Sequence, residues 1–93
     1  MQTIIKGEKR YIPMKVTRKK FPNVPFTIED ASYEVLNVVS GDCMIDQENK
    51  DIYFLLDTSS DDFKAGRKYL AEFTATIEGL PKVLKGRVVI NIV

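Results

Sequence analysis

The chain has 93 residues, of which 44% are hydrophobic and 29% are charged. This balance excludes the charge-rich, apolar-poor composition of disordered chains and predicts one domain over residues 1–93. Fourteen basic and thirteen acidic residues leave a formal net charge of +1, so charge selects neither nucleic acid nor a membrane surface as a partner.

The single cysteine, Cys43, excludes an intrachain disulfide and is typical of a reducing compartment. No apolar run is long enough for a signal-peptide core or for the roughly 20 residues of a membrane span. These observations predict a soluble chain that is not exported and that makes no membrane contact.

The first third of the chain predicts two strands and an irregular connection. A short strand around residues 3–5 ends before Gly7, and a second strand spans Tyr11 to Thr17. Even-numbered residues of the second strand share one apolar face: Ile12, Met14 and Val16. Pro13 cannot donate to a ladder, which predicts an edge strand, and the Pro-rich segment from Arg18 to Pro25 predicts a crossover.

The middle of the chain predicts a strand from Ser32 to Val39. Its apolar positions change phase after Val35, which indicates a bulge or burial on both faces. Short elements are expected next: a turn at residues 40–42, a strand at residues 43–45 and a polar turn at residues 46–50. The most apolar run, Asp51 to Asp57, predicts a central strand.

The last third shows the clearest alternation of apolar and polar residues. Tyr69 to Ile77 places every second residue inward, and Val83 to Val93 returns after a turn at residues 78–82. These two strands predict a long hairpin. The whole pattern predicts an all-β, immunoglobulin-like antiparallel β-sandwich of about seven strands, with a small barrel as the competing topology.

Catalytic chemistry is disfavoured because the sequence has no histidine. Ser-His and Cys-His nucleophilic systems are therefore impossible, and zinc would lack a usual ligand. Cys43 lies beside Asp42 and apolar residues that raise a thiol pKa, so it is interpreted as a structural strand residue. The sequence thus predicts a protein that is not an enzyme, with no catalytic, cofactor-binding or metal residues.

Acidic clusters at residues 42–46 and 59–62 could hold calcium at one end of a sandwich. Residues 46–51 begin like an EF-hand loop, but Lys50 occupies a ligand position and Asp51 replaces the required glycine. Solvated turns are therefore the favoured interpretation.

Two groups of residues suggest binding. The basic run Arg18-Lys19-Lys20 with Phe21 could track phosphates. Four aromatic residues could form a sugar-binding platform, although packing is favoured for each: Tyr11, Phe21, Phe26 and Tyr53.

Sheet edges and exposed apolar residues are the places where self-assembly is expected. The edges near Pro13 and near Lys85, Arg87 and Asn91 are guarded by proline and polar side chains, whereas the first strand is unguarded. A further apolar surface patch is predicted from three residues: Leu70, Leu80 and Val89.

The segment Phe63-Lys64-Ala65-Gly66-Arg67-Lys68-Tyr69 resembles the corner of immunoglobulin-like domains. There, a tyrosine at the start of a late strand directs its hydroxyl to the backbone of the preceding loop. Tyr69 would be that residue, and Ala71 stands where an antibody domain would have cysteine.

The layout of the whole chain is similar to small immunoglobulin-like domains of phage and prophage tail proteins, including the N-terminal domain of baseplate upper proteins. Apolar and glycine positions carry the resemblance: Lys6-Gly7, Ile12 to Val16, Phe26 to Val35, Phe63 to Tyr69 and Gly86 to Ile90. The Pro-rich Phe21 to Pro25 departs from the usual turn between the second and third strands.

The resemblance implies a structural module that docks onto other tail components or onto itself as a homo-oligomer, without catalysis, cofactor or nucleic acid. It also implies the bacterial cytoplasm before assembly and the virion afterwards. A carbohydrate- or ligand-binding sandwich is the alternative.

Overall fold

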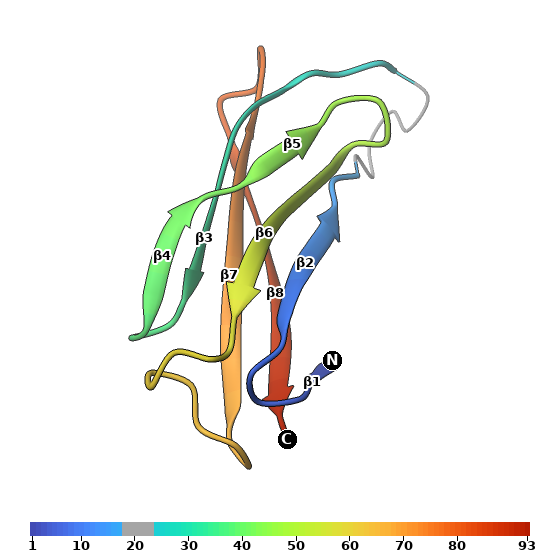
Figure 1. The fold of residues 1–93 in the computed structure, drawn as a ribbon. Helices are drawn as coiled ribbons and strands as arrows, with labels where there is room; N and C mark the ends of the chain where they lie inside the picture. The colour runs from blue at the N-terminus through green and yellow to red at the C-terminus, as the bar shows by residue number, and fades with distance from the viewer. Residues whose placement is uncertain (18–23) are drawn as a thin grey trace.

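The computed structural model describes residues 1–17 and 24–93, and these residues form eight strands and no helix (Figure 1). Five strands form one sheet in the order β1-β8-β7-β3-β4, and three form a second sheet in the order β2-β6-β5. The strands are β1 (Gln2–Ile4), β2 (Lys9–Lys15), β3 (Ile28–Val35), β4 (Val39–Asp42), β5 (Met44–Asp46), β6 (Asp51–Asp57), β7 (Lys68–Ile77) and β8 (Val83–Ile92).

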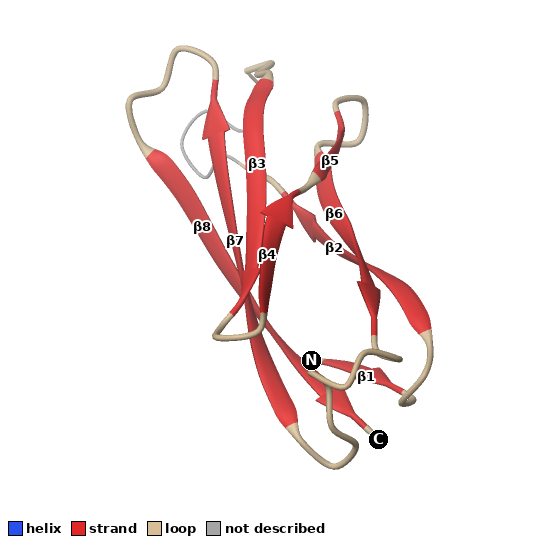
Figure 2. Ribbon diagram, turned by 60° about the vertical axis from the view of Figure 1, so that its left-hand side comes forward, coloured by secondary structure: helices blue, strands red, loops and turns tan. Residues whose placement is uncertain are grey.

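The two sheets lie in separate layers (Figure 2). The predicted all-β sandwich is therefore confirmed, with eight strands in place of about seven. The expectation of a wholly antiparallel structure is wrong at one position, because β1 pairs with β8 in parallel. The predicted crossover at residues 18–25 lies mostly outside the described residues.

The core is the layer of side chains between the sheets. The predicted alternation of β7 is confirmed, because Ala71, Phe73, Ala75 and Ile77 are each at most 3% exposed. The other fully buried apolar residues come from nearly every strand: Ile4, Ile12, Ile28, Val35, Ile52, Phe54, Leu56, Ile90 and Ile92. One aromatic stack crosses the layer, since the Tyr33 and Phe54 rings lie 3.8 Å apart, centroid to centroid, with nearly parallel planes.

Three further strand predictions are confirmed. The hairpin of β7 and β8 is paired continuously from Lys68 opposite Asn91 to Thr76 opposite Val83. Strand β6 is central in its sheet, and β2, which carries Pro13, is at an edge.

The predicted strand over residues 32–39 is wrong in its second half. Strand β3 ends at Val35, and the Val38 N–H donates to the Val35 carbonyl at 2.9 Å. Asn37 has a φ of 64°, which is a left-handed conformation that asparagine tolerates better than most residues. The change of apolar phase after Val35 therefore marks a tight turn, and the register shift in β3 lies earlier, between Ile28 and Asp30.

The predicted turn at residues 40–42 is also wrong, because these residues belong to β4. Gly41 has a packing role there: a Cβ atom at this position would lie 3.2 Å from the Tyr33 ring. The glycine is thus explained by space for the ring that stacks on Phe54, and not by turn geometry.

The predicted tyrosine contact is confirmed. The Tyr69 hydroxyl accepts a hydrogen bond from the Lys64 N–H at 2.8 Å and donates to the Asp62 carbonyl at 3.3 Å. Its ring packs edge-on against the buried Phe63, with the centroids 5.2 Å apart. The loop before β7 is therefore anchored to the start of that strand.

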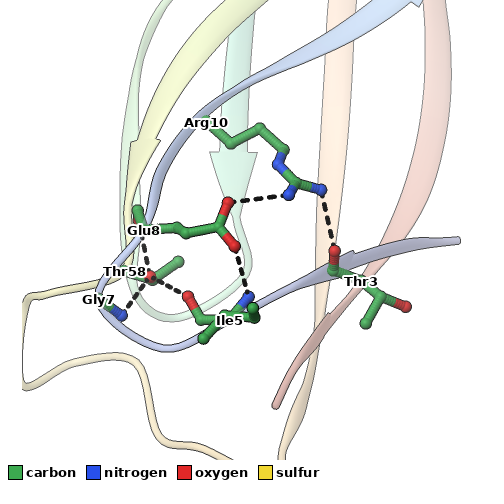
Figure 3. Close-up of polar contacts among 6 residues, drawn as sticks. All are labelled: Thr3, Ile5, Gly7, Glu8, Arg10 and Thr58. Atoms are coloured by element: carbon green, nitrogen blue, oxygen red, sulfur yellow. Dashed lines mark hydrogen bonds and ion pairs between the residues drawn. The ribbon is translucent and has the colours of Figure 1, made fainter.

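Thr58, which is fully buried, joins the turn between β1 and β2 to the end of β6 (Figure 3). Its hydroxyl accepts from the Gly7 N–H at 2.9 Å and donates to the Glu8 carbonyl at 2.7 Å. Its own N–H also donates to the Glu8 carbonyl, at 3.0 Å. Lys6 adds two bonds from its ammonium group, to the carbonyls of Thr58 and Ser60, each at 2.7 Å.

The first strand was expected to be an unguarded edge, and the structure corrects this (Figure 3). The Arg10 guanidinium donates to the Thr3 carbonyl at 2.9 Å and pairs with the Glu8 carboxylate at 2.8 Å. The other oxygen of Glu8 accepts from the Ile5 N–H at 3.3 Å. Arg10 of β2 therefore occupies a carbonyl of β1 that another chain would need, and Glu8, from the turn before β2, occupies the N–H that follows β1.

Replacing Thr58 with valine tests this junction. The variant removes the hydrogen bonds of the Thr58 hydroxyl to the Gly7 N–H and the Glu8 carbonyl. At about 0.5–1.5 kcal/mol for each bond, we expect a loss of about 1–3 kcal/mol in the free energy of unfolding. Urea denaturation followed by circular dichroism measures the loss. The exposed Thr27→Val is the matched control, and equal stability of the two variants would contradict the role given to Thr58.

Candidate interaction surface

The outer face of the three-stranded sheet is apolar at its centre. Alternation in β2, β5 and β6 points every second residue away from the core. Tyr11 is 56% exposed, Leu55 46% and Met44 44%. The outward side chains of five residues form a surface that we call the apolar face: Tyr11, Pro13, Met44, Tyr53 and Leu55.

Strand register brings the five residues together. Tyr11 lies opposite Leu55, and Tyr53 lies between Pro13 on one neighbouring strand and Met44 on the other. The Tyr11 and Tyr53 rings meet edge to face, with centroids 5.6 Å apart and planes at 82°. The apolar face is thus one continuous patch across three strands.

Ion pairs close both ends of the apolar face. Lys9 Nζ lies 4.0 Å from an Asp57 oxygen at one end, and Lys15 Nζ lies 3.4 Å from an Asp51 oxygen at the other. Hydrogen bonds from Ser59, and then the charge of Lys9, lower the pKa of Asp57 and keep it ionised. An apolar, aromatic centre with a charged rim is the arrangement found in protein–protein interfaces.

The outer face of the five-stranded sheet is different. At its centre Glu72 lies 3.1 Å from the Arg87 guanidinium and 3.8 Å from the Lys85 ammonium. Leu70 and Val89 face each other there as an apolar pair. The predicted third member of that patch, Leu80, is elsewhere, because it packs against the core cluster.

A groove of about 600 Å³ opens between the end of β2 and the β7–β8 hairpin. Its lining includes Met14, Phe73, Leu80 and Leu84. Thr17, the last described residue before residues 18–23, also lines it. We assign this groove no ligand.

The aromatic residues suggested for a sugar platform are divided by the structure. Tyr11 and Tyr53 are together on the apolar face. Phe26 packs against the core, and its ring lies 5.2 Å from the Lys50 ammonium. Phe21 and the basic run Arg18-Lys19-Lys20 lie outside the described residues.

The Asp46 carboxylate forms hydrogen bonds within its own turn. Asp46 accepts from the Glu48 and Asn49 N–H groups, both at 3.1 Å, and from the Asn49 amide at 2.9 Å. The bonds from Asn49 lower the pKa of the Asp46 carboxyl. In residues 1–17 and 24–93, no three acidic or cysteine side chains gather as a metal site would require.

Cys43 lies between β4 and β5, at the point where the chain passes from one sheet to the other. Its N–H donates to the Ala31 carbonyl at 2.9 Å. Burial, and then the charge of Asp42, raises the pKa of the Cys43 thiol to about 11. The direction predicted from its neighbours is confirmed, although the residue is in a crossing and not within a strand.

The raised pKa predicts a slow thiol. At pH 8 the Cys43 thiol stays protonated, so we expect it to react with a disulfide reagent at least about 10-fold more slowly than glutathione does, because the thiolate is the nucleophile. Absorbance of the released chromophore measures the rate, and the urea-unfolded chain is the control. A native rate equal to the unfolded rate would contradict the assignment.

No helix among the described residues could cross a membrane. Comparison of the chain with protein-family models, with curated proteins and with solved structures found no match.

Proposed function

We propose that this domain is a non-catalytic interaction module that docks through the apolar face. The observation that carries the proposal is the contrast between the two outer faces. The five-stranded sheet presents Lys85 and Arg87 to water, both paired with Glu72, whereas the three-stranded sheet presents tyrosine, leucine and methionine. Exposed apolar patches rimmed by charge are typical of protein-binding surfaces.

We also infer that the sandwich is immunoglobulin-like. Two features support this inference. The first is the strand order: β8, β7 and β3 lie side by side in one sheet, and β4 is added at the edge next to β3. Variable-type immunoglobulin domains extend the corresponding sheet by an edge strand in the same way. The Tyr69 hydroxyl bonds to the backbone of the preceding loop, as in the tyrosine corner.

The biological setting that we propose is a phage or prophage tail or baseplate. The resemblance of the chain to small tail domains supports it, and fold-level analogy carries that step. In this setting the partners are other tail components or further copies of the chain, and the domain passes from the bacterial cytoplasm into the virion.

A carbohydrate- or ligand-binding module is the alternative. The exposed Tyr11, in contact with Tyr53, is the observation that favours it. Protein docking is preferred because Pro13, Met44 and Leu55 offer sugar hydroxyls no strong hydrogen-bonding groups. Binding on a glycan array that is lost in Tyr11→Ser would favour the alternative.

Serine substitution on each sheet tests the proposal. The chain is co-expressed with the products of neighbouring genes, and the complexes that form are quantified by light scattering. We expect Leu55→Ser to weaken the complex about 10-fold or more, because truncating an interface centre removes a large share of the binding energy. Leu70→Ser, on the other sheet, is the matched control and should bind like the wild type.

Two results would contradict the proposal. One is equal binding by Leu55→Ser and Leu70→Ser variants that both fold, and the other is the absence of any complex with a neighbouring product and with the chain itself. Thermal melting curves establish that both variants are folded.

A further inference from the structure

We propose that the apolar face binds a second copy of this chain, in a two-fold dimer whose axis lies parallel to the strands, between β2 and β6. This inference rests on the proposed function, because it names the partner of the same surface. The arrangement of charge at the two ends of the face carries it.

On the outer face of the sheet, the paired residues of β2 and β6 form four rows. In the first row Lys9 lies opposite Asp57, and in the last row Lys15 lies opposite Asp51. Each charged row therefore has its lysine on β2 and its aspartate on β6. The two rows between them are apolar, with Tyr11 opposite Leu55 and Pro13 opposite Tyr53.

An axis parallel to the strands stacks β2 of one copy on β6 of the other, with the rows in the same order. Lys9 then faces the partner's Asp57, and Lys15 faces the partner's Asp51. Between them Tyr11 packs against the partner's Leu55. All four lysines of the dimer meet an aspartate, and every apolar row meets an apolar row.

An axis perpendicular to the strands reverses the order of the rows. Lys9 would then face the partner's Lys15, and Asp57 would face the partner's Asp51. Like charges placed face to face repel, and the cost rises as water is excluded. Charge therefore selects the parallel axis over the perpendicular one.

The charged side chains are available for contacts between copies. The side chains of Lys9 and Lys15 are 65% and 61% exposed, and the Lys9–Asp57 distance of 4.0 Å is at the limit of an ion pair. Exposed pairs of this kind contribute little within one chain. Reorientation of Lys9 toward a partner therefore costs little. The Lys15 ammonium also donates to the Asn49 carbonyl at 2.7 Å, and a further N–H of that ammonium remains for the partner's Asp51.

The size of the face sets the strength of the dimer. The dimer overlaps β2 and β6, two seven-residue strands that span about 24 Å in length and about 10 Å in width, so the contact is smaller than the roughly 800 Å² per partner of a standard interface. A weak, transient dimer is expected, of a kind that becomes stable where many copies are held together.

Charge exchange between two variants tests the dimer. The acidic variant carries Lys9→Asp and Lys15→Asp, and the basic variant carries Asp51→Lys and Asp57→Lys. Analytical ultracentrifugation up to about 1 mM measures the association, because a weak dimer forms only at high concentration. We expect the wild type to dimerise, each variant alone to be monomeric, and the equimolar mixture to form a heterodimer at least as well as the wild type.

Matched controls separate contact from net charge. Lys64→Asp with Lys68→Asp, and Glu29→Lys with Glu34→Lys, make the same charge changes at exposed positions away from the apolar face. Each control variant should still dimerise alone. If a double variant does not fold, as judged by circular dichroism, the single exchanges Lys9→Asp and Asp57→Lys make the same comparison.

A wild type that stays monomeric up to about 1 mM would overturn this inference. So would a mixture of folded variants that does not associate, or control variants that dissociate as fully as the face variants. A monomeric wild type that still binds a neighbouring gene product, with loss in Leu55→Ser, would leave the proposed function standing without the dimer.

Discussion

Two-residue alternation against one shared layer of buried side chains is the constraint on which this structure depends. In β6, the burial of Ile52, Phe54 and Leu56 forces Tyr53 and Leu55 to the outside. A slip of one residue would exchange the two faces of the strand. The outward residues are not needed to fill the core, so their apolar character requires an explanation of its own.

The register that builds the apolar face is fixed at both ends of the β2–β6 pair. At one end Thr58 binds the turn that precedes β2, through the Gly7 N–H and the Glu8 carbonyl. At the other end the Val16 N–H donates to the Lys50 carbonyl at 2.8 Å, and Lys15 reaches the Asn49 carbonyl at 2.7 Å. The face is therefore a property of a rigid pair of strands and not of loops.

Much of the fold could be predicted from the sequence because alternation is a local signal. It identified β6, β7 and β8. The loop contact of the Tyr69 hydroxyl was instead implied by the resemblance of residues 63–69 to the corner of immunoglobulin-like domains. The errors occurred where a residue type has two uses. Glycine is common in turns, but Gly41 lies in β4 and makes room for the Tyr33 ring. Asn37 continues an apolar run that predicts a strand, but its left-handed conformation forms the turn between β3 and β4.

The candidate surface could be predicted only in fragments. Tyr11 and Tyr53 stand out in the sequence only as separate aromatic residues. The face that they form with Met44 and Leu55 depends on the pairing of β6 with β5 and with β2, which is far from both in the sequence. The guarding of β1 was missed for the same reason. Arg10 follows Thr3 by seven residues, but it reaches the Thr3 carbonyl from the other sheet.

We propose that two copies of the chain meet through the outer face of the β2–β6 pair. Backbone amide resonances followed by nuclear magnetic resonance over a dilution series locate the surface at which the copies associate. We expect resonances of β2 and β6 to shift with concentration and those of β3, β7 and β8 to stay fixed. Shifts centred on the five-stranded sheet, or no shifts at all, would overturn the dimer.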